Sequence, residues 1–193
     1  MVVLALCGLV LVAILGKGLW DSVEAKKEKE VEAAYADAKT SDQLRSFAAA
    51  HPNHELAGIA QLRIADEAYG AGKAADAAAA YDKALGSLKG DALVARAKIG
   101  RALSNIQGGK TTDGESQLKQ IAGDANEFKA IRAEAAYQLA TLAIDAHNAA
   151  DAQKYIDQLN QIDPASVWAR RAMALQANLP RSATPAAPVA PKK

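Results

Sequence analysis

Apolar residues recur at helical spacing along most of this chain. In "AGIAQLRIADEAYGAG", residues 57–72, they return every three or four positions, as they do on one face of an α-helix. Half of the 193 residues are hydrophobic but only 5% are aromatic, and alanine is the dominant type. This composition favours closely packed helices over sheets of β-branched residues. The pattern therefore predicts an all-α protein.

The helical segments are arranged as a repeated helix–turn–helix unit. Four aspartates follow short polar turns at spacings of 34, 37 and 38 residues: Asp42, Asp76, Asp113 and Asp151. Five positions after each aspartate, a large side chain marks the apolar face of the second helix: Phe47, Tyr81, Leu118 and Ile156. Gly72 and Gly109 supply the left-handed conformation that ends many helices, and His147 stands where the last unit would have its glycine.

Two stretches, "LRIADEAYGAGKAADAAAAYDKAL" and "AAYQLATLAIDAHNAADAQKYIDQLNQIDP", resemble the tetratricopeptide repeat family. The resemblance rests on Ile64, Ala65, Gly72, Ala77, Tyr81 and Ala84 in the first stretch, and on Leu139, Ala140, Ala152, Ile156 and Pro164 in the second. It implies about four degenerate helix pairs that stack into an α-solenoid. Spacings of 37 and 38 residues exceed the 34 of that family.

Four segments follow from these patterns. Residues 1–20 are predicted to form a transmembrane anchor, and residues 21–54 a linker helix with a degenerate first helix pair. Residues 55–179 carry the repeats, closed by a capping helix in which Trp168, Met173 and Leu175 cover the last core face. Residues 180–193 are rich in proline and alanine and are expected to be disordered, because they have too few large apolar residues to bury.

The anchor prediction rests on "MVVLALCGLVLVAILGKGLW", which is uncharged before Lys17 and long enough to cross ~30 Å of hydrocarbon as a helix. Lys17 and Trp20 suit the membrane interface. The residues assigned to the anchor are Leu4, Leu9, Leu11, Ile14, Lys17 and Trp20. A cleaved signal peptide fits less well, because no basic segment or small-x-small site is present. A lipoprotein leader would need a small residue where Leu6 precedes Cys7.

One predicted span, a charged helix and degenerate repeats together resemble the bacterial ancillary Sec translocon subunit family. That resemblance covers about residues 9–164 and implies a single-pass inner-membrane protein. Its repeats would lie in the periplasm, bind translocon partners and assist newly exported proteins. The lysine distribution points the other way: Lys17, Lys26, Lys27 and Lys29 follow the span, so the positive-inside rule alone would place the repeats in the cytoplasm.

Several function classes are not expected. A net charge of +1 argues against a broad nucleic-acid surface. His51 and His54 in "HPNH" are more typical of a loop between helix pairs than of a metal site, since no third ligand is nearby. "GGK" at residues 108–110 lacks the spacing of a phosphate-binding loop. No catalytic residue, cofactor or metal is predicted, and an enzyme is not expected.

The remaining hypothesis is protein binding through the groove formed by the first helix of each pair. The candidate residues are Tyr35, Asp66, Tyr69, Leu103, Tyr137 and Thr141. Tyrosine suits such a groove because it tolerates partial exposure and offers a hydrogen bond. The alternative is a structural subunit of an envelope or cell-division complex, which would use the convex face and the cap.

Overall fold

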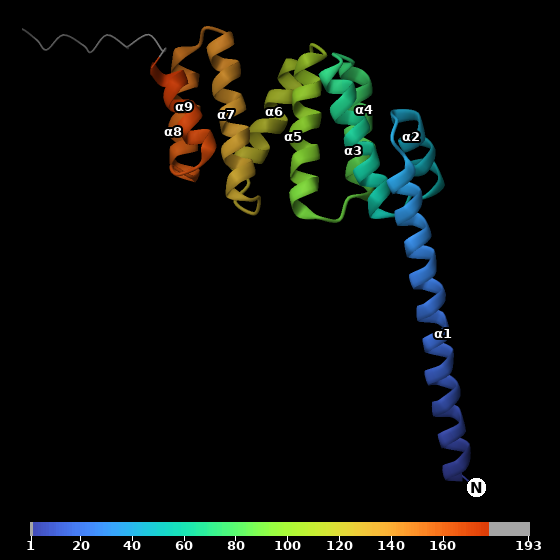
Figure 1. Ribbon diagram of the computed structural model, residues 1–193. Coiled ribbons are helices and arrows are strands. Elements are labelled where there is room, and N and C mark those ends of the chain that lie inside the picture. The colour runs from blue at the N-terminus through green and yellow to red at the C-terminus, as the bar shows by residue number, and fades with distance from the viewer. Residues whose placement is uncertain (1, 178–193) are drawn as a thin grey trace, which may run out of the picture. The chain divides into compact units, whose positions relative to one another are not determined.

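The computed structural model describes residues 2–177, and for residues 2–16, 18 and 19 it describes the backbone alone. Within residues 2–177 the regular structure is entirely helical (Figure 1). The helices are α1 (Val2–Asp37), α2 (Ser41–Ala50), α3 (Glu55–Gly70), α4 (Ala74–Ser87), α5 (Asp91–Gln107), α6 (Thr111–Gly123), α7 (Lys129–Asp145), α8 (Ala149–Ile162) and α9 (Val167–Ala177). The predicted all-α class is confirmed for these residues. The predicted disordered tail, 180–193, lies outside them.

The chain forms two compact units, Met1–Ala97 and Lys98–Lys193, and the boundary falls within α5. In the first unit, α3 packs most extensively on α4 and also on α2. In the second unit, α7 packs on α8 and α6, and α9 contacts both α7 and α8. Each unit is therefore built from helix hairpins that are consecutive in the sequence.

Three of the hairpin turns share one geometry. Gly72, Gly109 and His147 all have positive φ, at 73°, 82° and 56°. In each turn the next amide donates to a carbonyl five residues back: Lys73 to Ala68 at 2.9 Å, Lys110 to Asn105 at 2.8 Å, and Asn148 to Ala143 at 2.8 Å. This is the Schellman arrangement, which satisfies carbonyls at the end of the first helix. The predicted role of the two glycines is confirmed, and His147 adopts the same left-handed conformation.

Replacing His147 by glycine is expected to raise the free energy of unfolding by up to about 1 kcal/mol, because only glycine adopts this conformation without a Cβ penalty. The side chain of His147 is exposed, so little packing is lost. Chemical denaturation would measure the change. Gly109→Ala is the matched reversal and should lower stability by a similar amount; a loss of stability in both variants would contradict this account of the turn.

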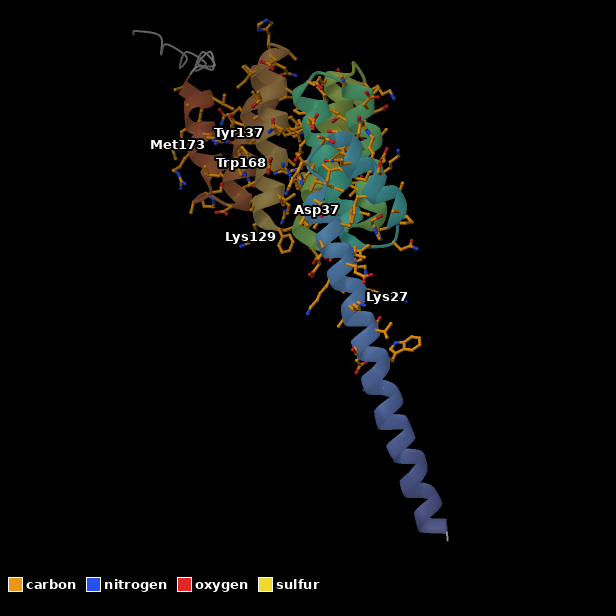
Figure 2. The ribbon with its side chains drawn as sticks, turned by 45° about the vertical axis from the view of Figure 1, so that its right-hand side comes forward. Lys27, Asp37, Lys129, Tyr137, Trp168 and Met173 are labelled. Carbon is orange, nitrogen blue, oxygen red and sulfur yellow. The ribbon has the colours of Figure 1, made fainter. Side chains whose placement is uncertain are left out.

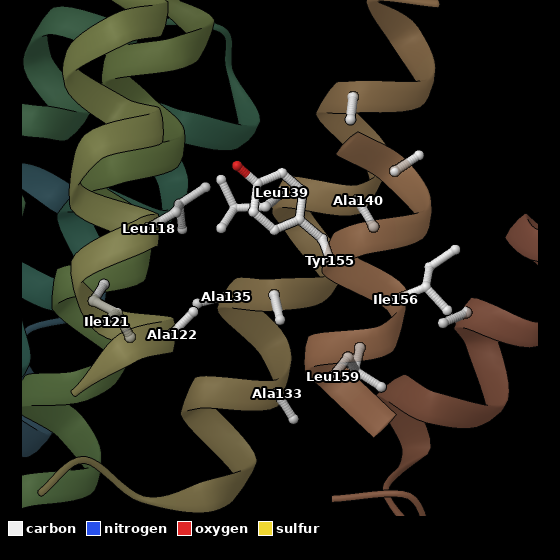
Figure 3. Close-up of a cluster of buried hydrophobic side chains, with 14 of the residues drawn as sticks. Leu118, Ile121, Ala122, Ala133, Ala135, Leu139, Ala140, Tyr155, Ile156 and Leu159 are labelled. Carbon is white, nitrogen blue, oxygen red and sulfur yellow. The ribbon is translucent and has the colours of Figure 1, made fainter. Parts of the chain in front are cut away.

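The second helix of each pair buries the side chains that the repeat pattern singled out. Phe47, Tyr81, Leu118 and Ile156 are all buried, with at most 6% of their surface exposed. In the second unit, Leu118 and Ile156 join Leu139, Leu159 and several alanines in one core (Figure 3). Alanine at these positions lets the helix backbones approach closely, so a small number of large side chains fills the space between them.

The backbones of α5 and α6 approach each other closely at Gly114. A Cβ atom placed on Gly114 would lie 2.4 Å from Cγ1 of Ile106 and 2.5 Å from the backbone oxygen of Ala102. Both distances are well inside van der Waals contact. Gly114 occupies the position that Ala77 and Ala152 hold in the neighbouring repeats, so here even a methyl group has no room.

The C-terminal part of helix α1 packs against the other helices of the first unit. Val31 and Tyr35 are half-buried against the unit's core, and Nε2 of His54 lies 3.0 Å from Oε1 of Glu28. Nδ1 of His54 accepts from the amide of Leu56 at 3.1 Å, so Nε2 carries the proton and donates to Glu28. The side chains of residues 20–30 are all exposed.

Helix α1 runs through the predicted boundary between anchor and linker without a break. Among the described residues, none of the helices has the length and apolar character that a membrane crossing requires. The side chains of Leu4, Leu9, Leu11 and Ile14 lie outside the described part, while those of Lys17 and Trp20 are exposed. The span at residues 1–20 thus stays a prediction.

Candidate functional site

Asp66, a predicted groove residue, joins three helices of the first unit. Its Oδ1 accepts from the hydroxyl of Tyr81 in α4 at 2.7 Å, and its Oδ2 accepts from Nη2 of Arg96 in α5 at 2.5 Å. The side chain of Asp66 is 37% exposed and that of Arg96 is 59% exposed. Both carboxylate oxygens of Asp66 already have protein donors, which makes it a residue that holds α3, α4 and α5 together.

Tyr81 is the buried member of this group. Burial, and then the hydrogen bond to Asp66, raise the pKa of its phenol far above the usual range. The folded state holds the phenol protonated, while the unfolded chain releases the phenol proton near pH 10. Ionisation of Tyr81 therefore leaves the free energy of unfolding unchanged below that pH and lowers it above that pH.

Tyr81→Phe should therefore reduce the loss of unfolding free energy between about pH 10 and pH 11. At neutral pH the same variant should lose about 0.5–1.5 kcal/mol, since Asp66 loses a donor. Urea unfolding at a series of pH values would test both parts. An unchanged alkaline loss in the variant would show that another group is responsible.

The other two candidates in the first unit are aromatic. The rings of Tyr35 and Phe47 have centroids 5.5 Å apart, and the guanidinium of Arg63 lies 5.9 Å from the centroid of Tyr35. Tyr35 and Tyr69 are both half-buried against the unit's core. Each thus contributes to packing and leaves part of its surface accessible, which is the arrangement expected of a contact residue on a repeat surface.

In the second unit, the candidate Tyr137 lies beside a residue that the sequence interpretation had placed in the cap. The ring centroids of Tyr137 in α7 and Trp168 in α9 are 5.2 Å apart, and the guanidinium of Arg171 lies 4.9 Å from the Trp168 ring. Figure 2 shows Tyr137 and Trp168 together, with Met173 away from them on the outer side of α9. Both rings are half-buried. Trp168 therefore belongs to the candidate surface as well as to the cap, where it and Leu175 pack on the core as predicted. The prediction that Met173 also covers the core face is wrong, because its side chain is 61% exposed.

Leu103 and Thr141 have simpler environments. Leu103 in α5 is half-buried against the core of the second unit. The hydroxyl of Thr141 donates to the carbonyl oxygen of Tyr137 at 3.1 Å, one turn earlier in α7. Because the hydroxyl is the donor in that bond, the methyl group and both oxygen lone pairs of Thr141 stay available for other contacts. Tyr137, Thr141 and Trp168 form what we call the aromatic surface of the second unit.

A groove on the second helices of the first unit was not expected from the sequence. It has a volume of about 630 Å³ and lies between α2 and α4, with α3 beneath it. Five alanines contribute to its walls, and Ile64 of α3 also lines it. Near one end, the Ser87 hydroxyl donates to the carbonyl oxygen of Pro52 at 2.9 Å and links the two walls. The groove forms where these small side chains face one another across α2, α3 and α4. The sequence does not predict it, because a run of alanines does not show which of them will face one another.

The histidines of "HPNH" have structural roles. His51 ends α2 and its ring lies 4.9 Å from that of Phe47, while His54 caps the start of α3. Among the described residues, no three His, Cys, Asp or Glu side chains are grouped so that they could hold a metal ion. The interpretation of "HPNH" as a loop between helix pairs is confirmed.

No protein-family model matches this chain, and no curated protein or solved structure matches it significantly.

Proposed function

We propose that this protein is a membrane-tethered helical-repeat scaffold that binds other proteins during export or envelope assembly, with its repeats in the periplasm of a bacterium. The observation that carries the proposal is the aromatic surface. Tyr137 and Trp168 are large, half-buried rings on α7 and on the capping helix α9, and such rings supply much of the binding energy at protein interfaces. The proposed action is binding alone, with no chemical step.

The repeat architecture supports a binding role. Helix hairpins with the same turn occur at residue 72 in the first unit and at residues 109 and 147 in the second, and their first helices carry most of the candidate residues. Repeat proteins of this kind use such surfaces to hold extended or helical segments of partners. Tyr35 and Tyr69 are further half-buried aromatic side chains on the first unit.

The tether is supported by α1. It is 36 residues long, and its exposed segment from Trp20 to Glu30 separates the apolar N-terminal residues from the part that packs on the first unit. The side chain of Trp20 is 73% exposed, which would leave it accessible to a membrane interface. An anchor of this kind would raise the effective concentration of the binding surface near membrane partners.

Protease protection in spheroplasts tests the location. A C-terminal tag is added to the full chain, and the repeats should be digested by external protease while a cytosolic marker survives. Protection of the tag until the cells are lysed would overturn the periplasmic assignment. Release of the chain from membranes by alkaline carbonate would overturn the anchor.

Site-specific photo-crosslinking tests the binding surface. A photoreactive amino acid at Tyr137 or Thr141 should yield crosslinks to other proteins in intact cells. The same amino acid at Lys154, an exposed position of α8 in the same unit, is the control. Equal yields at all three positions would show that the aromatic surface is not a preferred binding site.

A structural subunit of an envelope or cell-division complex is the second candidate. Val167 and Met173 of α9 are 45% and 61% exposed, so the terminal helix keeps apolar side chains available for a permanent partner. A stable complex of fixed stoichiometry that is lost on Met173→Glu would favour this role. Weak binding to many unfolded proteins, unaffected by that change, would favour the export role.

A further inference from the structure

Trp168, one of the three residues of the aromatic surface, lies on α9, the helix that leads directly into the C-terminal segment. Trp168, Arg171 and Leu175 are spaced three and four residues apart, so they share one side of α9, and Trp168 meets Tyr137 of α7 there. Trp168 and Leu175 are half-buried against the core of the second unit. Trp168 on this side of α9 and Tyr137 of α7 therefore form a pair of rings that packing holds in place and that keep part of their surface accessible.

The sequence after α9 has prolines at a regular spacing, which we call the proline ridge. Pro185, Pro188 and Pro191 are each three residues apart in "PAAPVAP", residues 185–191. A polyproline II helix has three residues per turn, so these three rings would lie along one edge, about 19 Å long. Proline ridges of this kind dock into surfaces lined by aromatic rings, at little cost in conformational entropy.

The connecting segment is long enough to bring this ridge back to the aromatic pair. Trp168 precedes the end of α9 at Ala177 by nine residues, which corresponds to about 14 Å along the helix axis. Eight residue steps lead from Ala177 to Pro185, and an extended chain of that length reaches about 26 Å. The segment can thus reverse direction and still reach Trp168.

The charges allow the same contact. Residues 185–191 carry no charged side chain, so they bring no cation toward the guanidinium of Arg171 on Trp168. Lys192 and Lys193 follow the ridge and lie beyond it in the chain. The ridge therefore offers only apolar rings and methyl groups, which suit the faces and edges of Trp168 and Tyr137.

We propose that residues 185–191 dock within the same chain onto Tyr137 and Trp168, and so compete with partner proteins for the aromatic surface. The docking itself does not require any partner, whereas its regulatory meaning rests on the proposed function. An intramolecular ligand of this kind lowers the apparent affinity of the surface for partners in proportion to the fraction of time that it is bound.

Fluorine NMR of the full chain in detergent micelles, with both tryptophans replaced by 5-fluorotryptophan, tests the docking. The sequence holds two tryptophans, so Trp20 in α1 serves as the internal control. The triple variant Pro185→Ala, Pro188→Ala, Pro191→Ala should shift the Trp168 resonance and leave that of Trp20 in place. A synthetic peptide of residues 178–193 added to this variant should return the Trp168 resonance toward its original position, and the same peptide with alanine for its prolines should not.

Two results would overturn the proposal. One is an identical Trp168 resonance in the native chain and the triple variant. The other is a difference that disappears on dilution, which would assign the docking to a second copy of the chain. Crosslinking from Tyr137 separates this test from that of the function: yields should rise several-fold in the triple variant if the ridge competes with partners, while an absence of crosslinks in both chains would overturn the proposed function and leave the fluorine result standing.

Discussion

Gly114→Ala is expected to lower the free energy of unfolding by about 1–3 kcal/mol, the usual cost of overpacking a closely packed core. The new Cβ would meet Ile106 Cγ1 at 2.4 Å and the Ala102 carbonyl oxygen at 2.5 Å. A side chain can change rotamer, but a helix backbone has to move, so α6 must shift away from α5. Hydrogen exchange should therefore accelerate in both helices.

Gly86→Ala is the matched control for that prediction. Gly86 also lies in a helix, α4, but a Cβ placed on it would meet no other atom within 4 Å. Alanine is the better helix former, so Gly86→Ala should stabilise the protein by about 0.5–1 kcal/mol. Effects of the same sign in the two variants would mean that helix propensity, and not close approach, governs position 114.

Leu139→Ala is expected to lower the free energy of unfolding by about 2–5 kcal/mol. Leu139 is 2% exposed and packs among alanines that cannot extend into the space it would leave. The lost contacts and the cavity add together, and chemical denaturation would measure the sum. Met173→Ala, on the exposed face of α9, is the control and should change stability by no more than ~0.5 kcal/mol. Equal losses in the two variants would contradict the assignment of the core.

The repeat pattern predicted the hairpins well, because their determinants are local. Turn residues 72, 109 and 147 and the second-helix positions 47, 81, 118 and 156 can be found by spacing alone, and the structure gives them common conformations and burial. Periodicity indicates which side of a helix is apolar. It says much less about which residue of another helix that side will meet.

The candidate surface depended on such pairings. The position of Asp66 in its repeat predicts a groove residue, but its carboxylate accepts hydrogen bonds from Tyr81 and Arg96, which lie 15 and 30 residues away in the sequence. The position of Trp168 after the last repeat predicts its place in the cap, but it does not predict its contact with Tyr137, which depends on how α9 packs on α7. The sequence offers one signal for the hydrogen bond between Tyr81 and Asp66. The repeat pattern places Tyr81 on the buried face of its helix, and a buried phenol usually has a hydrogen-bond partner.

The contacts between consecutive helices also bear on how the chain acquires its structure. The most extensive packing in each unit is between helices that follow one another, α3 with α4 and α7 with α8. A hairpin of this kind closes a short loop, so its formation costs little chain entropy and does not wait for distant residues. Each hairpin can therefore form as soon as its second helix is available. A chain delivered from its N-terminus, by a ribosome or through a pore, would fold one hairpin at a time in the order of its sequence.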